Sequence, residues 1–152
     1  MAEAFSLAQE YFETIGVLRR EGGEEFAAEY FAAQRGFWLA RVESELAGCV
    51  GLRQLDLPEE YPERGAKCAE IKRMYVRERF RGRGIAQKLL KAAEQFGFGC
   101  GFEWIYLDTT DAMKTAAHLY QSNGYERCDR YNQNSQATIF MRKKLPLTSG
   151  ST

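Results

Sequence analysis

Residues 69–90 read AEIKRMYVRERFRGRGIAQKLL and join three kinds of segment: a strand, a cationic loop and the start of a helix. Residues 68–76 are rich in strand-forming residues and predict a strand that ends at Val76. Gly82 and Gly84 stand where the apolar spacing predicts a helix over about 84–97. Unpaired N–H groups and the positive dipole end at such a helix start, together with flanking arginines, attract anions. The stretch therefore predicts a site for phosphate or pyrophosphate.

Two familiar phosphate loops do not fit these residues. A Walker loop requires Gly-x-x-x-x-Gly-Lys-Ser/Thr, which the sequence lacks here. A dinucleotide fingerprint requires a third Gly or Ala where this chain has Gln87, and its turn is shorter. The plain alternative is an ordinary helix start with solvated arginines.

The remaining pattern predicts a mixed α/β sheet with parallel neighbours across the two later helices. The 84–97 helix is expected to bury one apolar face that includes Phe96. Residues 56–66 contain two prolines and four acids and are expected to form an exposed loop. The other predicted elements are helices over 3–18, 24–34 and 111–122, a hairpin of 37–42 and 46–55, and strands over 103–109, 125–131 and 137–144.

Length and composition restrict the class of protein. A chain of 152 residues that is 45% apolar predicts one folded domain over 1–145, followed by a small polar tail over 146–152 that we expect to be disordered. Equal numbers of basic and acidic residues, 21 each, disfavour a nucleic-acid partner. No apolar run reaches the roughly 18 residues that a membrane helix needs, so we expect no membrane helix. The acidic N-terminus is unlike a signal peptide. The four cysteines are scattered, which argues against a metal site and favours free thiols in the cytoplasm.

Three separated motifs resemble the GNAT superfamily of N-acetyltransferases. Arg79-x-x-Gly82-x-Gly84 after a strand is similar to its acetyl-CoA signature, Arg/Gln-x-x-Gly-x-Gly/Ala. Residues 108–110 (DTT) and 116–125 (AAHLYQSNGY) resemble its second half, in which a helix ends in Leu-Tyr-x-x-x-Gly-Phe/Tyr, and residues 139–145 resemble its last strand. The resemblance runs from about 37 to 145. It implies an α/β fold with a mixed, mostly antiparallel sheet, a central parallel and splayed strand pair, and helices on both faces.

The resemblance also implies how acetyl-CoA is bound. In the family, the pyrophosphate lies on backbone amides of the glycine loop, and the pantetheine arm bonds to the end of the preceding strand. A bulge in that strand aims an N–H at the thioester oxygen, where it stabilises the oxyanion. Carried over to this chain, the donor-binding residues are Met74, Tyr75, Val76, Arg79, Arg81, Gly82, Arg83, Gly84, Ile85 and Ala86.

Catalysis in the family proceeds by direct attack of a primary amine on the thioester in a ternary complex. Tyr120 matches the family tyrosine that gives a proton to the leaving sulfur, and its alternative role is core packing. Glu70 lies where some members place a general base. In the alternative interpretation, Glu70 is a solvent-facing strand carboxylate, and a water chain replaces the general base.

The acceptor is expected to be a small amine, with an amino-acid-like amine as one candidate, and two groups of residues point to its site. Arg53, Lys72 and Arg73 form a cationic set suited to an acidic acceptor group, unless they are a salt-bridged surface. Tyr131 and Asn132 resemble a loop of small-molecule members, unless they serve only as turn residues. A protein N-terminus or lysine is the alternative acceptor. A non-catalytic CoA-binding regulatory module is the alternative function.

One departure from the family concerns the first strand. Family members normally begin with a strand, whereas this chain starts almost directly in the predicted 3–18 helix. The 37–42 strand is then expected to have an open edge, and open edges are normally paired or covered. The sequence therefore predicts a homodimer that shields this edge, with a monomer blunted by twist or by the N-terminal helices as the alternative.

Overall fold

The computed structural model describes residues 2–4, 6, 34–111 and 114–146. The helices expected over 3–18 and 24–34 lie almost wholly outside these residues, as does the tail beyond Pro146. The chain divides into two compact units, which we name unit 1 (Met1–Arg53 and Lys72–Ala93) and unit 2 (Gln54–Ile71 and Glu94–Thr152). Three expectations stay predictions: the single domain over 1–145, the splaying of the parallel strand pair, and the presence of helices on both faces of the sheet.

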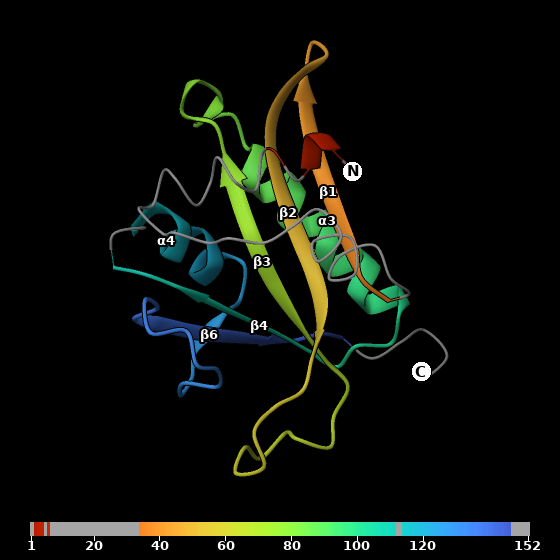
Figure 1. The fold of residues 1–152 in the computed structure, drawn as a ribbon, viewed down its shortest axis with the longest axis vertical. Helices are drawn as coiled ribbons and strands as arrows, with labels where there is room; N and C mark the ends of the chain where they lie inside the picture. Colours follow the sequence, from red (N-terminus) through yellow and green to blue (C-terminus); the bar gives the residue numbers. More distant parts are fainter. Residues whose placement is uncertain (1, 5, 7–33, 112–113, 147–152) are drawn as a thin grey trace. The chain divides into compact units, whose positions relative to one another are not determined.

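Unit 1 begins with the predicted hairpin (Figure 1). Strand β1, Gly36–Val42, pairs antiparallel with β2, Glu45–Leu55. The two turn residues, Glu43 and Ser44, have φ values of 51° and 71°. Left-handed conformations at both turn positions match the natural twist of paired strands, which explains the tight connection. In the hydrogen-bonded order of the described strands, β1-β2-β3-β4-β6-β5, β1 is an edge strand, as the sequence predicts.

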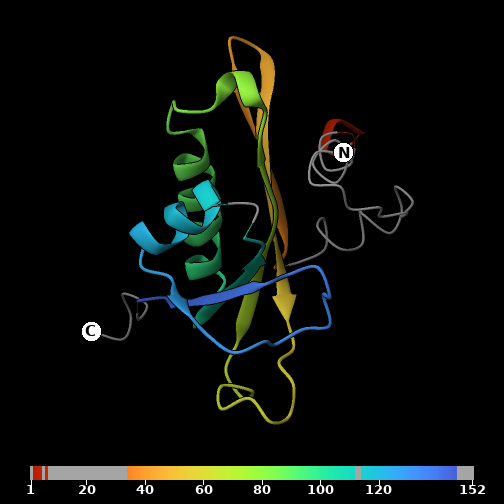
Figure 2. The same cartoon turned by 90° about the vertical axis from the view of Figure 1, so that its left-hand side faces the viewer.

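Strand β3, Cys68–Val76, has the bounds predicted from the sequence, and its last five residues belong to unit 1. A single 3-10 turn, η1 (Glu78–Phe80), and the glycine loop lead into helix α3, Ile85–Gly99. The first turns of α3 lie beside β2 and β3 (Figure 2). A Cβ atom on Gly48 would lie 2.6 Å from the Tyr75 carbonyl oxygen and 3.3 Å from Leu89 Cδ1, so this contact requires glycine.

Unit 2 contains the central parallel pair, which confirms the mixed sheet. Strand β3 pairs in parallel with β4 over Cys68–Ile71, and β6 pairs antiparallel with both β4 and β5. The prediction of parallel neighbours across the second later helix is wrong, because β6 lies between β4 and β5. The bounds are Trp104–Thr109 for β4, Lys114–Ser122 for α4, Glu126–Arg127 for β5 and Ile139–Lys144 for β6.

The strand expected over 125–131 is much shorter than predicted. The Cys128 N–H still donates to the Phe140 carbonyl of β6 at 2.9 Å, and beyond this bond polar side chains satisfy local carbonyl groups. The Arg130 guanidinium donates to the carbonyls of Asn134 at 2.8 Å and Ala137 at 3.2 Å. These bonds hold the 128–138 segment as a loop, which contributes to the site described below.

Both described α-helices end at glycine, as the sequence predicts. Gly101 and Gly124 have φ values of 84° and 92°, and each closes a paired hydrogen-bond cap in which the next residue bonds five positions back. Phe96 corrects the predicted buried face of α3, because it is 37% exposed. The buried line of the helix runs through Leu90, Ala93 and Gly97, and Phe96 lies to one side of it.

The 56–66 loop is only partly the exposed segment that we expected. It extends beyond the start of β3 (Figure 2), yet Leu57 is 7% exposed and belongs to the core of unit 2. The ring of Tyr61 packs edge-on against Tyr106 at 5.8 Å, and its hydroxyl donates to the Asp129 carbonyl at 2.7 Å. Leu57 and Tyr61 thus pack this acidic segment against the core of unit 2.

Candidate active site

The glycine loop of unit 1 presents open backbone at the start of α3. Gly82 and Gly84 have φ values of 80° and 76°, a region that side chains with a Cβ rarely adopt. No heavy atom of the described residues lies within 4 Å of a Cβ built on either glycine. The Lys88 N–H donates to the Gly84 carbonyl at 3.2 Å. The earlier first-turn amides, including those of Ile85 and Ala86, therefore have no acceptor within the helix.

Arginines hold the loop in place and line it. The Arg77 N–H donates to the Ala47 carbonyl at 2.8 Å and its guanidinium to the Leu46 carbonyl at 3.0 Å, so Arg77 anchors the loop to β2. The Nε–H of Arg81 donates to the Val76 carbonyl at 2.9 Å. The sequence placed Arg77 in the cationic loop without this anchoring role. The contact that explains it is tertiary.

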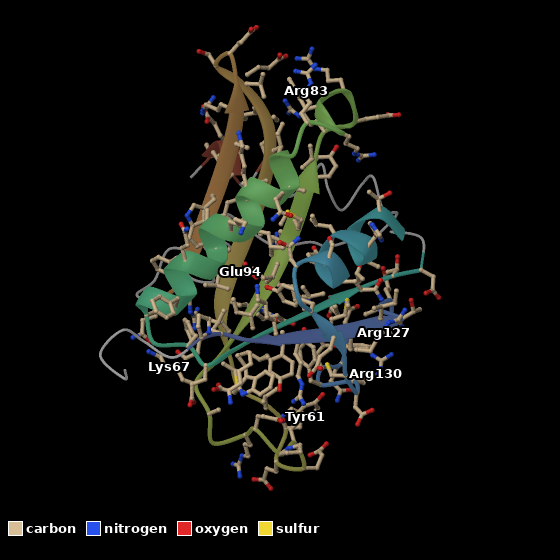
Figure 3. All side chains as sticks on the ribbon, turned by 180° about the vertical axis from the view of Figure 1, so that it is seen from behind. Tyr61, Lys67, Arg83, Glu94, Arg127 and Arg130 are labelled. Atoms are coloured by element: carbon tan, nitrogen blue, oxygen red, sulfur yellow. The ribbon has the colours of Figure 1, made fainter. Side chains whose placement is uncertain are left out.

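Arg79 and Arg83 share one aromatic support. Their guanidinium carbons lie 4.5 Å and 5.5 Å from the centre of the Phe80 ring. Arg79 also forms an ion pair with Glu45, whereas the exposed Arg83 lies at the loop (Figure 3). Stacking on the Phe80 ring restrains both cations within the loop. The loop thus combines two of the features that bind a phosphate group, a helix start and positioned guanidinium groups.

Strand β3, the strand in which the resemblance implies a bulge, contains a backbone irregularity at Arg73. Arg73 has a φ of 60° and is 4% exposed, and its carbonyl accepts a hydrogen bond from the Cys49 thiol at 3.2 Å. A left-handed residue that is not glycine is costly and tends to occur at functional sites. Met74 is half-buried, and Tyr75 and Val76 are each 8% exposed.

The cationic set expected at Arg53, Lys72 and Arg73 is divided by burial. Arg73 is buried, whereas Arg53 and Lys72 are half-buried. The description of these three residues as a salt-bridged surface therefore does not apply to Arg73. A buried guanidinium needs polar partners. The left-handed backbone of Arg73 is also the irregularity in β3.

Glu70 lies in a buried polar cluster of unit 2. It is 0% exposed, so its interpretation as a solvent-facing carboxylate is wrong. Its Oε2 accepts hydrogen bonds from the Tyr131 hydroxyl at 2.6 Å and from Asn132 Nδ2 at 3.3 Å. These donors offset the cost of burying a carboxylate. Burial and the nearby carboxylates of Glu70 and Asp108 raise the pKa of Tyr131 well above its ordinary value, which keeps its hydroxyl protonated as a donor.

Asn132 links two carboxylates. Its Nδ2 also donates to Asp108 Oδ2 at 2.6 Å, and Asn134 Nδ2 donates to the same oxygen at 3.3 Å. The structure thus brings Glu70, Tyr131 and Asn132 together, three residues that the sequence proposed separately. It adds Asp108, which the sequence noted only as part of a motif. Two fixed carboxylates of this kind can accept a proton or hold an amino group.

Tyr120 lies near the end of α4 in unit 2 and is 4% exposed. Its ring packs edge-on against Tyr125, with the ring centres 5.8 Å apart and the planes at 62°. This contact supports the core-packing interpretation of the ring and leaves a role for its hydroxyl open. His118, on the same helix, is exposed as the sequence predicts.

A cavity of about 400 Å³ in unit 2 is lined by residues 60–63 and 127–130 and by Arg142, and so by none of the predicted site residues. No group of three or more His, Cys, Asp or Glu side chains in the described part of the chain is placed to hold a metal ion, and the four cysteines are free. Within the described ranges, no helix is long and apolar enough to cross a membrane.

Comparison with known proteins identifies the family. The model of the acetyltransferase (GNAT) family matches residues 1–125. The probable N-acetyltransferase family 8 member 5 of Mus musculus is 29% identical over 109 residues, which are 72% of this chain and 46% of the mouse protein. The chain thus spans about half the length of this relative.

Solved structures agree on the fold. A GNAT-family acetyltransferase from Staphylococcus aureus superposes with a TM-score of 0.75 at 20% identity, over 95% of this chain and 92% of the other. The PaiA N-acetyltransferase from Thermoplasma acidophilum, solved in complex with coenzyme A, superposes with a TM-score of 0.59 at 23% identity, over 72% and 60%. The family match over most of the sequence, together with this fold, leads to one conclusion: the chain belongs to the GNAT family of acetyltransferases.

Proposed function

We propose that the protein transfers an acetyl group from acetyl-CoA to the primary amine of a small molecule, by direct attack within a ternary complex. The observation that carries the proposal is the open, left-handed glycine loop at the start of α3. A loop of this shape exposes amides to a diphosphate at close range. The coenzyme A bound to the PaiA N-acetyltransferase supports the choice of donor.

In this proposal the pyrophosphate accepts hydrogen bonds from backbone N–H groups of residues 81–86, and the pantetheine arm bonds to residues 74–76. Arg79 exchanges its exposed ion pair with Glu45 for a phosphate oxygen, which costs little because exposed ion pairs are weak. The left-handed conformation of Arg73 rotates the following peptide relative to a regular strand. We assign the N–H of Met74 to the thioester oxygen, where it stabilises the tetrahedral oxyanion.

The acceptor must first lose a proton, because a free amine with a pKa near ~10 is mostly charged at neutral pH. Glu70 takes this proton, directly or through a water molecule, while Tyr131 and Asn132 hold the carboxylate in place. The amine nitrogen then attacks the carbonyl carbon. When the intermediate collapses, the carbon–sulfur bond breaks and the Tyr120 hydroxyl gives its proton to the departing sulfur. The extra proton on the attacking nitrogen is lost to solvent and restores the Tyr120 hydroxyl, which leaves the neutral amide and the CoA thiol.

The acceptor class and the setting are also part of the proposal. We favour an amino-acid-like amine, with the buried Glu70–Asn132–Asp108 cluster near its amino group and with Arg53, Lys72 or Arg73 toward an acidic group. Four free cysteines suit a reducing compartment, so we place the reaction in the cytoplasm. The edge position of β1 supports a homodimer.

The test is release of CoA thiol across a panel of amines, amino acids and peptides. Release with free amino acids but not with peptides supports the proposal, and the reverse supports a protein acceptor. A thermal shift by acetyl-CoA without thiol release for any amine indicates a non-catalytic binding module instead. Glu70→Gln should lower turnover at neutral pH, whereas Glu126→Gln, which changes an exposed residue of the same unit, should not.

A further inference from the structure

The end of α4 holds Tyr125 against Tyr120 in two ways. Gly124, at a φ of 92°, lets the Tyr125 N–H donate to the Tyr120 carbonyl at 3.1 Å. The two rings also pack edge-on at 5.8 Å. A movement of the Tyr125 ring therefore displaces the ring of Tyr120, because backbone and side chain are both coupled.

The far end of Tyr125 is fixed by a charged pair. Its hydroxyl donates to Glu94 Oε2 at 2.9 Å, and Lys143 Nζ donates to the same oxygen at 3.1 Å. The side chains of Glu94 and Lys143 are 12% and 26% exposed, and Glu94 projects from α3 (Figure 3). The Lys143 ammonium also lies 5.7 Å from the centre of the Tyr125 ring.

Lys143 packs on the glycine that shapes this helix end. A Cβ on Gly124 would lie 3.6 Å from Lys143 Cε, so the lysine stem covers the cap while its ammonium bonds to Glu94. Three elements, α3, the end of α4 and β6, thus meet at the Tyr125 hydroxyl and ring. The family motif admits Phe or Tyr at this position, and only tyrosine provides the hydroxyl that Glu94 binds.

We propose that Glu94, Tyr125 and Lys143 form a clamp that positions Tyr120 for proton transfer to the leaving sulfur. The inference rests on the proposed function of Tyr120 and adds positioning residues for that step. Displacement of a reacting group by about 1 Å can cost on the order of 100-fold in rate, so a clamp on the neighbouring ring has a direct kinetic effect.

Two further observations favour a positioning role over simple stabilisation. A mostly buried ion pair is seldom more stabilising than apolar side chains of similar volume, so stability alone does not explain Glu94 and Lys143. Burial, with the Glu94 carboxylate, raises the pKa of Tyr125 well above its ordinary value. The hydroxyl therefore stays protonated and keeps donating to Glu94 throughout the pH range of an assay.

The test begins with Tyr125→Phe, which removes only the clamped hydroxyl, and Glu94→Leu, which removes its acceptor. Both should lower kcat about tenfold while KM for acetyl-CoA changes less than about twofold, since the donor site is untouched. Glu94→Gln keeps an acceptor for the hydroxyl and should recover most of the kcat. Glu103→Leu is the matched control for Glu94→Leu, because it removes another hydrogen-bonded carboxylate of unit 2, the acceptor of the Lys67 N–H, and should leave kcat unchanged.

Each change is then repeated in a Tyr120→Phe background. If the clamp acts through the Tyr120 hydroxyl, Tyr125→Phe should have no further effect on kcat there. An equal loss in both backgrounds, or no loss in the single variant, overturns the clamp and leaves the proposed acetyl transfer intact. If Tyr120→Phe itself keeps full kcat, the leaving-group role fails and the clamp fails with it. Ring signals of labelled Tyr120 give a check that is independent of activity, since Tyr125→Phe must shift or broaden them.

Discussion

Gly82→Asp tests the donor site most directly. The variant should fold, because no heavy atom of the described residues lies within 4 Å of the new Cβ, and Asp tolerates the φ of 80° better than most residues. We expect a loss of stability of about 1 kcal/mol from the backbone. The new carboxylate would then face the pyrophosphate in the proposed complex.

The size of the effect follows from Coulomb's law. One negative charge about 5 Å from another, at an effective dielectric constant of about 20, costs about 3 kcal/mol, which is on the order of 100-fold in the dissociation constant of CoA. Salt weakens the repulsion between exposed charges, so the loss should shrink as ionic strength rises. Titration calorimetry with CoA at low and high salt measures both quantities.

Gly82→Asn is the matched control, since it has the same shape and backbone strain without the charge. It should bind CoA much more tightly than Gly82→Asp. A thioester that lacks the pyrophosphate, such as S-acetyl-N-acetylcysteamine, should react equally with both variants. Equal affinity of the Asp and Asn variants for CoA at low salt would show that the pyrophosphate does not lie at this loop.

Tyr120→Phe should lower turnover by about 100-fold to 10,000-fold, the usual contribution of a positioned acid, and change acetyl-CoA affinity little; unchanged turnover in single-turnover measurements would remove Tyr120 from the mechanism. Gly48→Ala should lower the free energy of unfolding by about 1–3 kcal/mol, because its Cβ would lie 2.6 Å from the Tyr75 carbonyl oxygen; denaturant unfolding checks this, and a neutral result would mean that the strand shifts easily. Sedimentation at micromolar concentration should give a dimer, and a species at the chain mass of 17.4 kDa would reject the pairing expected at β1.

Local sequence was sufficient for the elements that depend on neighbouring residues. The bounds of β3 and the hairpin of β1 and β2 followed from strand propensity and turn position, and both helix ends followed from glycine. The glycine loop was recognisable for the same reason, since its glycines and arginines stand close together in the sequence at the helix start. Resemblance to the family then supplied the central parallel pair within a mostly antiparallel sheet.

Where the sequence was wrong, distant parts of the chain decided the outcome. Glu70 was open to a solvent-facing interpretation because strand alternation does not reveal what covers a face. Its partner Tyr131 is 61 positions away in the sequence, and the loop that brings it there was predicted as a strand. The exposure of Phe96 and the burial of Leu57 likewise depend on which surface each element meets.

The sequence by itself determined the family, the glycine loop that we propose for the donor, and the identity of the residues proposed for catalysis. Tertiary structure decided which of those residues meet. Asn132 joins Glu70 to Asp108, the thiol of Cys49 bonds to the left-handed Arg73, and Glu94 holds Tyr125 against Tyr120. The physical reason is the range of the interactions. Propensities, caps and turns act over a few residues and can be read in order, whereas burial and buried hydrogen bonds depend on contacts that form only when the whole chain has folded.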